Sequence, residues 1–201
     1  MAQVSFADLT AAARAGEAIA FPTDTVPALA VRPDRAAVIF EVKQRSHDKP
    51  LILMGASAAD LWPYVRGSAA ALAQWQALAD RHWPGALTLV LPSSDRTPAA
   101  INPLESGSVG IRVPDSAIAR RILQETGVLA TTSANRSGEP PLRTMDAIAA
   151  AFPTVTVPNE EWLTATLGAG EGIEGSGQPS TVVQWIGQGW EVLRQGAIAV
   201  G

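Results

Sequence analysis

The sequence has 201 residues, 47% of them hydrophobic and 17% charged, which fits one globular domain with a full core. The absence of cysteine excludes disulfides and thiolate sites, and two histidines are too few for a histidine-rich metal centre. A net charge of -4 argues against a surface devoted to nucleic acid. No apolar run approaches the roughly 20 residues of a membrane helix. The N-terminus has no signal-peptide pattern, so we expect a cytoplasmic protein without membrane association.

The N-terminal segment predicts a helix followed by a strand. Ser5 is a candidate helix cap and Gly16 a candidate stop, with apolar residues on one face between them. Residues 18–21 form a short apolar strand that ends at Pro22, before the polar run Thr23-Asp24-Thr25. The pattern therefore predicts a strand that leads into a polar turn.

The next segment predicts a helix, a strand and two more helices. Asp34 is expected to cap the first of these helices, which delivers Lys43 and Arg45 to its C-terminal end. Residues 51–54 indicate a buried strand, and residues 57–83 two helices interrupted by proline and glycine.

The middle of the chain predicts three strands and a helix. Residues 86–91 and 109–113 are apolar runs of the strand type, separated by a proline-containing polar segment. Asp115 is expected to cap the following helix, and Gly127 to end it before a strand begins at residue 128.

The C-terminal part predicts a helix, a glycine-rich loop and a hairpin. The helix covers residues 144–152, the loop 167–178, and the hairpin strands 181–186 and 190–193. Strands and helices alternate along the chain, so we expect an α/β protein whose twisted mixed sheet is flanked by helices.

Three cations in a short span form the best phosphate-binding candidate. Lys43, Arg45 and Lys49 could bind a triphosphate and stabilise a departing pyrophosphate. The same residues could instead be a solvated helix end that complements the helix dipole.

Two further polar groups follow predicted strands. Thr131, Thr132, Ser133 and Asn135 could converge on an anion or adenosine, or could simply cap the next loop. Arg112 could bind a carboxylate with two hydrogen bonds, or could be an edge-strand arginine that reaches solvent. Ser133 lacks the glycine-flanked elbow of a nucleophilic serine.

Seven short motifs occur in one order along the chain, and together they resemble the YrdC/TsaC threonylcarbamoyl-AMP synthase family from about residue 10 to 200. They are Phe21-Pro-Thr-Asp-Thr-Val, Lys43-Gln-Arg with Lys49-Pro-Leu-Ile-Leu, Trp83-Pro-Gly-Ala-Leu-Thr, Val109-Gly-Ile-Arg-Val-Pro, Thr132-Ser-Ala-Asn-Arg-Ser-Gly, Pro179-Ser-Thr-Val-Val and Arg194-Gln-Gly. The resemblance implies a single YrdC-like domain over residues 1–201, a large concave cavity, and no further C-terminal domain.

The resemblance also implies a nucleotidyltransferase that makes L-threonylcarbamoyl-AMP and pyrophosphate from L-threonine, bicarbonate and ATP with Mg²⁺, and with no protein metal site. The product would serve threonylcarbamoylation of an adenosine in tRNA, through handover to a tRNA threonylcarbamoyl transferase complex. By this resemblance, the catalytic residues are Lys43, Arg45, Ser133 and Asn135; the ATP-binding residues are Lys43, Arg45, Lys49, Ser108, Ser133, Asn135 and Arg194; and the threonine-binding residues are Thr23, Arg112, Thr132 and Ser180.

Some positions depart from the pattern of relatives. Where relatives often have Val-Tyr-Gly-Leu-Gly, this chain has Val26-Pro-Ala-Leu-Ala, and Ser46 and Met54 replace a frequent proline and a histidine. An alternative hypothesis is a YciO-like paralogue that binds nucleotide or double-stranded RNA without synthase activity. Weak tRNA binding is a possible secondary role, limited by the acidic net charge.

Overall fold

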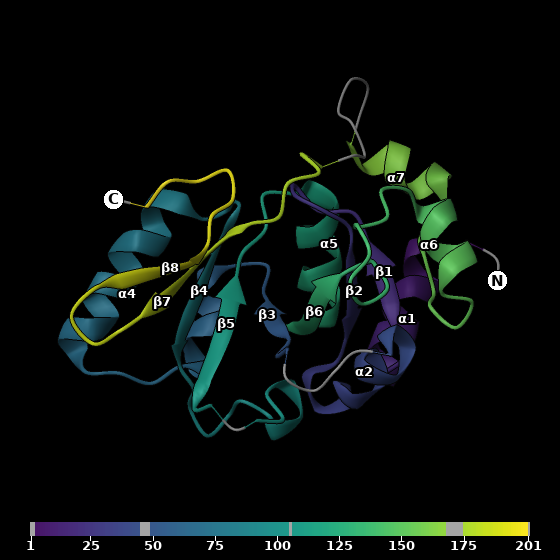
Figure 1. The fold of residues 1–201 in the computed structure, drawn as a ribbon. Helices are drawn as coiled ribbons and strands as arrows, with labels where there is room; N and C mark the ends of the chain where they lie inside the picture. The colour runs from purple at the N-terminus through teal and green to yellow at the C-terminus, as the bar shows by residue number, and fades with distance from the viewer. Residues whose placement is uncertain (1–2, 45–48, 105, 168–174, 201) are drawn as a thin grey trace.

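The computed structural model describes residues 3–44, 49–104, 106–167 and 175–200. These residues form one 8-stranded twisted sheet with strand order β1-β2-β6-β3-β5-β4-β7-β8 (Figure 1). The strands are β1 (Ile19–Phe21), β2 (Ala28–Val31), β3 (Ile52–Met54), β4 (Leu87–Pro92), β5 (Ser108–Arg112), β6 (Leu129–Ser133), β7 (Thr181–Trp185) and β8 (Trp190–Arg194). The pairs β3–β5 and β4–β7 are parallel and the other neighbours are antiparallel, so the predicted mixed sheet is confirmed.

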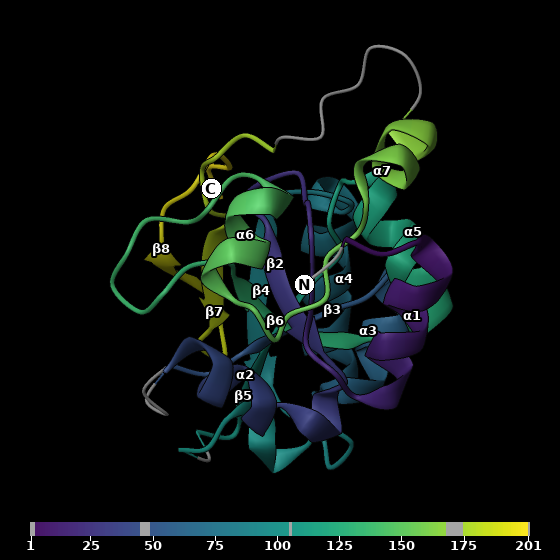
Figure 2. The same ribbon diagram turned by 90° about the vertical axis from the view of Figure 1, so that its right-hand side faces the viewer.

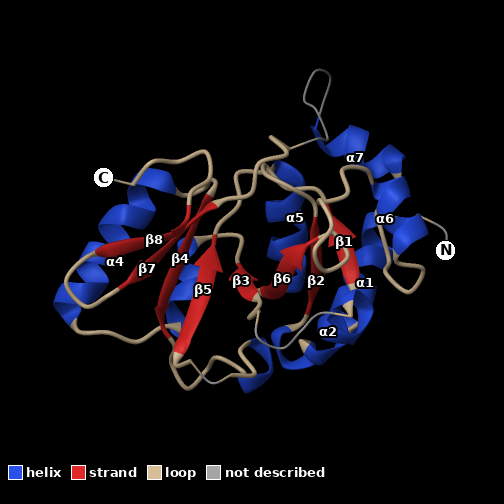
Figure 3. Ribbon diagram, viewed as in Figure 1, coloured by secondary structure: helices blue, strands red, loops and turns tan. Residues whose placement is uncertain are grey.

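Helices cover the sheet on both sides. They are α1 (Phe6–Ala15), α2 (Ala37–Lys43), α3 (Ala58–Leu61), α4 (Ala69–His82), α5 (Ala117–Thr126), α6 (Met145–Ala151) and α7 (Glu160–Leu167), with short 3-10 turns at Pro33–Arg35, Trp62–Tyr64 and Ala99–Ile101. Figures 2 and 3 show α1, α3, α4 and α5 on one side of the sheet and α2 on the other. Within the described ranges, no helix is long and apolar enough to span a membrane.

Of the three predicted N-terminal helix caps, Ser5 is correct, and Asp34 and Asp115 are wrong. The Ser5 side chain accepts a hydrogen bond from Asp8 N at the start of α1, and Gly16 ends that helix with a φ of 84°. Asp34 lies instead in a 3-10 turn ahead of α2, which begins after Ala36 without a side-chain cap. Ser116, the residue after Asp115, caps α5 by accepting from Ala119 N. Ser116 is one position nearer to α5 than Asp115, so its hydroxyl is better placed to accept from the unpaired N–H groups of the first helical turn.

Two elements were not predicted from the sequence. Strand β2 is buried at all four residues and lacks the alternation that marks a half-exposed strand. Helix α7 follows Asn159, whose side chain accepts a hydrogen bond from Trp162 N as an N-cap does. The predicted glycine-rich loop falls mostly on residues 168–174, outside the described residues.

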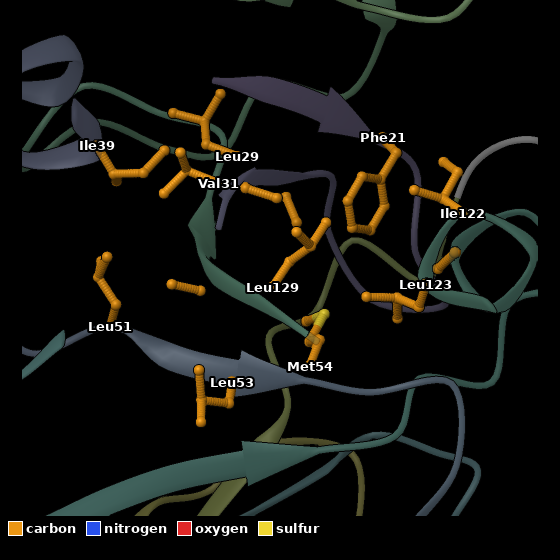
Figure 4. Packing of buried hydrophobic residues seen from close by; sticks show 14 of the residues in the cluster. Phe21, Leu29, Val31, Ile39, Leu51, Leu53, Met54, Ile122, Leu123 and Leu129 are labelled. Atoms are coloured by element: carbon orange, nitrogen blue, oxygen red, sulfur yellow. The ribbon is translucent and has the colours of Figure 1, made fainter. Parts of the chain in front are cut away.

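The hydrophobic core lies between the sheet and its helices. Phe21 of β1 points toward Ile122 and Leu123 of α5, and all three side chains are buried (Figure 4). On β5, Val109 and Ile111 are buried in the core, and alternation turns Gly110 and Arg112 to the opposite face. This second face carries the cavity described next.

Candidate functional site

A cavity of about 230 Å³ opens on this second face of the sheet. Its walls come from seven strands of the sheet, β2 to β8, and from the segments that precede β2, β3 and β7. The lining residues are Thr25, Val26, Ala28, Pro50, Ile52, Met54, Thr88, Arg112, Thr131, Thr132, Ser133, Pro179, Ser180, Val182 and Arg194. The cavity therefore combines an apolar floor with hydroxyl groups and two arginines.

Arg112 is the most deeply buried cation of the cavity wall, with a side chain only 3% exposed. Its Nε donates to Gly85 O at 3.0 Å, its Nη1 to Thr25 Oγ1 at 2.9 Å, and its Nη2 to Asp24 Oδ1 at 2.6 Å. Burial lowers the pKa of the guanidinium, while Asp24 opposes that shift by stabilising the charged form. Three of the five N–H groups are thus used, and one on each terminal nitrogen remains for a ligand.

The two threonines of the turn before β2 have different positions. Thr23 donates to Val26 O at 2.8 Å and accepts from Thr25 N at 3.2 Å, and the two threonine hydroxyls lie 3.1 Å apart. Because Thr23 donates its only hydroxyl proton to Val26 O, the Thr25 hydroxyl is the donor between the two threonines. These bonds saturate the Thr23 hydroxyl, which lies away from the cavity surface, whereas Thr25 lines the cavity.

Lys43 joins the end of α2 to the turn that follows β6. Its ammonium donates to Ser133 O at 2.6 Å, Asn135 Oδ1 at 3.2 Å and Thr132 Oγ1 at 3.3 Å. The side chain is only 1% exposed. The structure therefore brings the predicted lysine and the predicted hydroxyl–amide turn together, with the lysine beneath the turn.

Asn135 is held by the protein at both ends of its amide. Its Oδ1 also accepts from Ser133 Oγ at 2.6 Å, and its Nδ2 donates to Arg136 O at 2.9 Å and Glu139 O at 2.7 Å. This uses both donors and both lone pairs of the amide. Asn135 thus shapes the turn, while Thr132 and Ser133 reach the cavity.

The opposite wall is formed by Arg194 and Ser180. Arg194 donates from Nε and Nη2 to Ser180 O at 3.1 and 2.9 Å, and Ser180 Oγ lies 2.9 Å from Thr88 Oγ1. Burial lowers the pKa of the Arg194 guanidinium. Its positive charge also acts on Arg112, which places two cations across one cavity.

The remaining predicted residues lie around this centre or outside the described chain. Ser108 begins β5 on the same face as Arg112 but does not line the cavity, and its Oγ lies 2.8 Å from Ser106 Oγ. Lys49 is exposed next to the lining residue Pro50, and Arg45 falls outside the described residues.

Several lining residues were missed from the sequence, among them Thr25, Thr88 and Ile52. Thr25 could have been found from the doubled threonine of its motif. Thr88 and Ile52 belong to two of the quoted motifs, but they lie inside apolar strands, where nothing local marks them as lining residues. Two positions that depart from relatives, Ala28 and Met54, also line the cavity and so affect its shape.

The described residues contain no group of three or more His, Cys, Asp or Glu that could hold a metal ion. Magnesium commonly binds proteins through one or two carboxylates together with substrate phosphates.

Comparison with known proteins gives a consistent result. The protein family described as telomere recombination (Sua5, YciO and YrdC) matches residues 11–196. The threonylcarbamoyl-AMP synthase of Escherichia coli O1:K1 is 37% identical over 145 residues, which are 68% of this chain and 75% of that relative.

Solved structures with the same fold include two that bear on the family. The crystal structure of P. abyssi Sua5 complexed with L-threonine matches with a TM-score of 0.80 and 30% identity, over 97% of this chain and 56% of that one. This chain therefore spans little more than half the length of that protein. E. coli YciO matches with a TM-score of 0.77 at 20% identity, over 96% of this chain and 89% of that one.

Proposed function

Because the chain belongs to the Sua5/YciO/YrdC family, we propose that it makes threonylcarbamoyl-AMP and pyrophosphate from L-threonine, bicarbonate and ATP. One observation carries the proposal: a buried arginine on the cavity wall keeps two N–H groups for a ligand carboxylate. The curated relative at 37% identity is named for this reaction, and the P. abyssi relative was crystallised with L-threonine.

In this proposal threonine occupies the deep part of the cavity. Its carboxylate binds the two available N–H groups of Arg112, since planar guanidinium and carboxylate groups form paired hydrogen bonds. Thr25, Thr132 and Ser180 supply hydroxyls around it, and Thr23 orients Thr25 from below. A cavity of about 230 Å³ suits a small polar molecule, because drug-sized ligands occupy roughly 300–1,000 Å³.

The nucleotide would extend from the cavity along the open face. Ser133 and Arg194 contact its phosphates, with Lys49 and Ser108 further along, and Lys43 supports the turn that holds Ser133. Positive charge in a partly buried site stabilises the negative charge that moves onto pyrophosphate. A magnesium ion bound to the triphosphate would add to this stabilisation.

The reaction needs two bond-forming steps that positioning can assist. The amine of threonine forms a C–N bond with carbon dioxide derived from bicarbonate and loses a proton, which gives a carbamate. A carbamate oxygen then bonds to the α-phosphorus of ATP while the bond to the β-phosphate oxygen breaks and pyrophosphate leaves. The main contribution expected of the protein is to hold the reacting groups close together and correctly oriented. The labile product would pass to a tRNA-modifying enzyme.

Threonine-dependent release of pyrophosphate from ATP tests the proposal. The full chain is incubated with ATP, Mg²⁺ and bicarbonate, with and without L-threonine, and the product is identified by mass spectrometry. We expect pyrophosphate only when threonine is present. ATP binding without pyrophosphate release at saturating bicarbonate would instead support a nucleotide-binding paralogue.

A further inference from the structure

The segment that follows β8 lies against the start of β7. Residues 195–198 come directly after Arg194, which lines the cavity. The approach is so close that a Cβ on Gly196 would lie 2.4 Å from Pro179 O. The position of Arg194 is therefore linked to how this C-terminal segment is held.

One buried hydroxyl holds the segment. Thr181 Oγ1 accepts from Gly196 N at 2.9 Å and from Ile198 N at 3.2 Å, and it donates to Ile198 O at 2.6 Å. Thr181 is 0% exposed and does not line the cavity. A hydroxyl has one donor and two acceptor sites, so these three bonds use all of its capacity. Thr181 can therefore act on the cavity only through the segment that it holds.

Strand pairing does not hold the segment in the same way. Strand β8 has an extra residue at Leu193, which forms a bulge, and its pairing with β7 ends at Arg194. A bulge locally disrupts the ladder of backbone hydrogen bonds. The Thr181 hydroxyl thus gives residues 196–198 the hydrogen bonds that a continued ladder would have supplied.

Arg194 is fixed through both its side chain and its backbone. Its guanidinium donates to Ser180 O at 3.1 and 2.9 Å, and its backbone is tied to Thr181 two residues further on. An arginine side chain loses conformational freedom when it binds a ligand, and fixing it beforehand reduces that cost. Loss of the Thr181 hydroxyl should therefore weaken binding of the ligand that Arg194 contacts.

Ser180 depends less on the C-terminal segment. Its hydroxyl lies 2.9 Å from Thr88 Oγ1, and Thr181 N donates to Ala86 O at 2.9 Å where β7 pairs with β4. Neither of these bonds involves the Thr181 hydroxyl. The Ser180 side of the cavity should therefore keep its geometry when that hydroxyl is removed.

We propose that Thr181 is a positioning residue for the nucleotide half of the site: its hydroxyl fixes residues 196–198 and thereby Arg194, without touching either substrate. This inference rests on the proposed function, in which Arg194 contacts the phosphates of ATP, and deepens it by naming the group that holds Arg194 in place. It separates the two substrates, because threonine binding relies on Ser180 and Arg112 instead.

Calorimetric titrations of the full chain with ATP, and separately with L-threonine, test this. Thr181→Val removes the hydroxyl but keeps the size of the side chain. We expect its Kd for ATP to rise about 10-fold and its Kd for L-threonine to change less than about 2-fold. Thr181→Ser keeps the hydroxyl and should bind ATP within about 3-fold of the wild type. Amide hydrogen exchange at Gly196 and Ile198 should be about 10- to 100-fold faster in Thr181→Val and not in Thr181→Ser.

Thr10→Val is the matched control. Thr10 is also buried, at 4% exposed, but its hydroxyl donates to Ala7 O within α1. Thr10→Val should leave both Kd values and the exchange at Gly196 unchanged. Gly196→Ala is a second test, because it keeps the Thr181 hydroxyl while its Cβ pushes the segment away from Pro179. It should weaken ATP binding as Thr181→Val does.

Equal weakening of ATP and threonine binding in Thr181→Val would overturn the inference, as would unchanged ATP binding despite faster exchange. A Thr181→Ser that binds ATP as weakly as Thr181→Val would overturn it too. If Thr181→Val does not fold, the ATP and threonine Kd values of Gly196→Ala decide in the same way. A wild type that binds ATP but releases no pyrophosphate with threonine present would overturn the proposed function alone. The ratio of the two Kd values would still decide the role of Thr181.

Discussion

Two arginine–aspartate pairs in this protein have the same length but opposite surroundings. Arg112–Asp24 and Arg32–Asp34 both have N–O distances of 2.6 Å. The side chains of the first are 3% and 14% exposed, and those of the second 44% and 53%. Water screens the charges of the exposed pair, so that pair contributes about 1 kcal/mol or less to folding stability. In the buried pair, loss of one partner leaves a charge that water cannot reach. The surroundings of such a pair therefore decide the cost of breaking it to protein stability more than its N–O distance does.

Replacing the buried arginine should have the largest effect. Arg112→Met leaves Asp24 without its cation, so we expect about 3–5 kcal/mol lower stability to urea and no threonine-dependent pyrophosphate release. The double variant Asp24→Asn/Arg112→Met should recover stability but not activity. A single variant as stable as the wild type would show that the pair is not buried in solution.

Lys43→Met should have the next largest effect. The ammonium supports three oxygens of the Thr132–Asn135 turn, and its loss should cost about 1.5–3 kcal/mol. We also expect a loss of pyrophosphate release of about 100-fold. Glu41→Ala, an exposed change on the same helix, serves as control and should leave both urea stability and activity unchanged.

Gly110→Ala probes the cavity floor. A Cβ there would lie 2.7 Å from Ile52 Cγ2 and 3.5 Å from Thr88 Cγ2, both on cavity-lining residues. Overpacking of this kind costs about 1–3 kcal/mol and should raise the KM for threonine more than it lowers kcat. Gly189→Ala, where a Cβ meets nothing within 4 Å, should leave both constants unchanged.

The smallest effect is expected for the exposed pair. Arg32→Ala should change the free energy of unfolding at neutral pH by less than about 0.5 kcal/mol. The hydrogen bond from Arg32 lowers the pKa of Asp34. Any stabilisation by this pair is therefore present above the unfolded-state pKa and lost as the pH falls through the folded-state pKa. Urea titrations of Arg32→Ala and the wild type at neutral and acidic pH measure this change in the free energy of unfolding. A change at neutral pH well above about 0.5 kcal/mol would contradict the expectation that the exposed pair contributes little to stability.

Local signals in the sequence identified much of the fold. Caps such as Ser5 and stops such as Gly127 act within a few residues of where they occur, so they can be recognised without tertiary contacts. Strand β2 was missed because both its faces are buried, which removes the alternating pattern. The structure also places Arg112, Thr132, Ser133, Ser180 and Arg194 on one cavity, as the motifs had predicted.

The sequence alone determined most of the element types, the acidic and cysteine-free character, and the motifs that place the chain in its family. The tertiary structure decided which side chains line the cavity: it places Thr25 and Ser133 on the cavity wall, and Thr23 and Asn135 behind them. The reason is physical. A hydroxyl or amide is available only if its donors and acceptors are unused, and strand pairing between distant segments sets those partners.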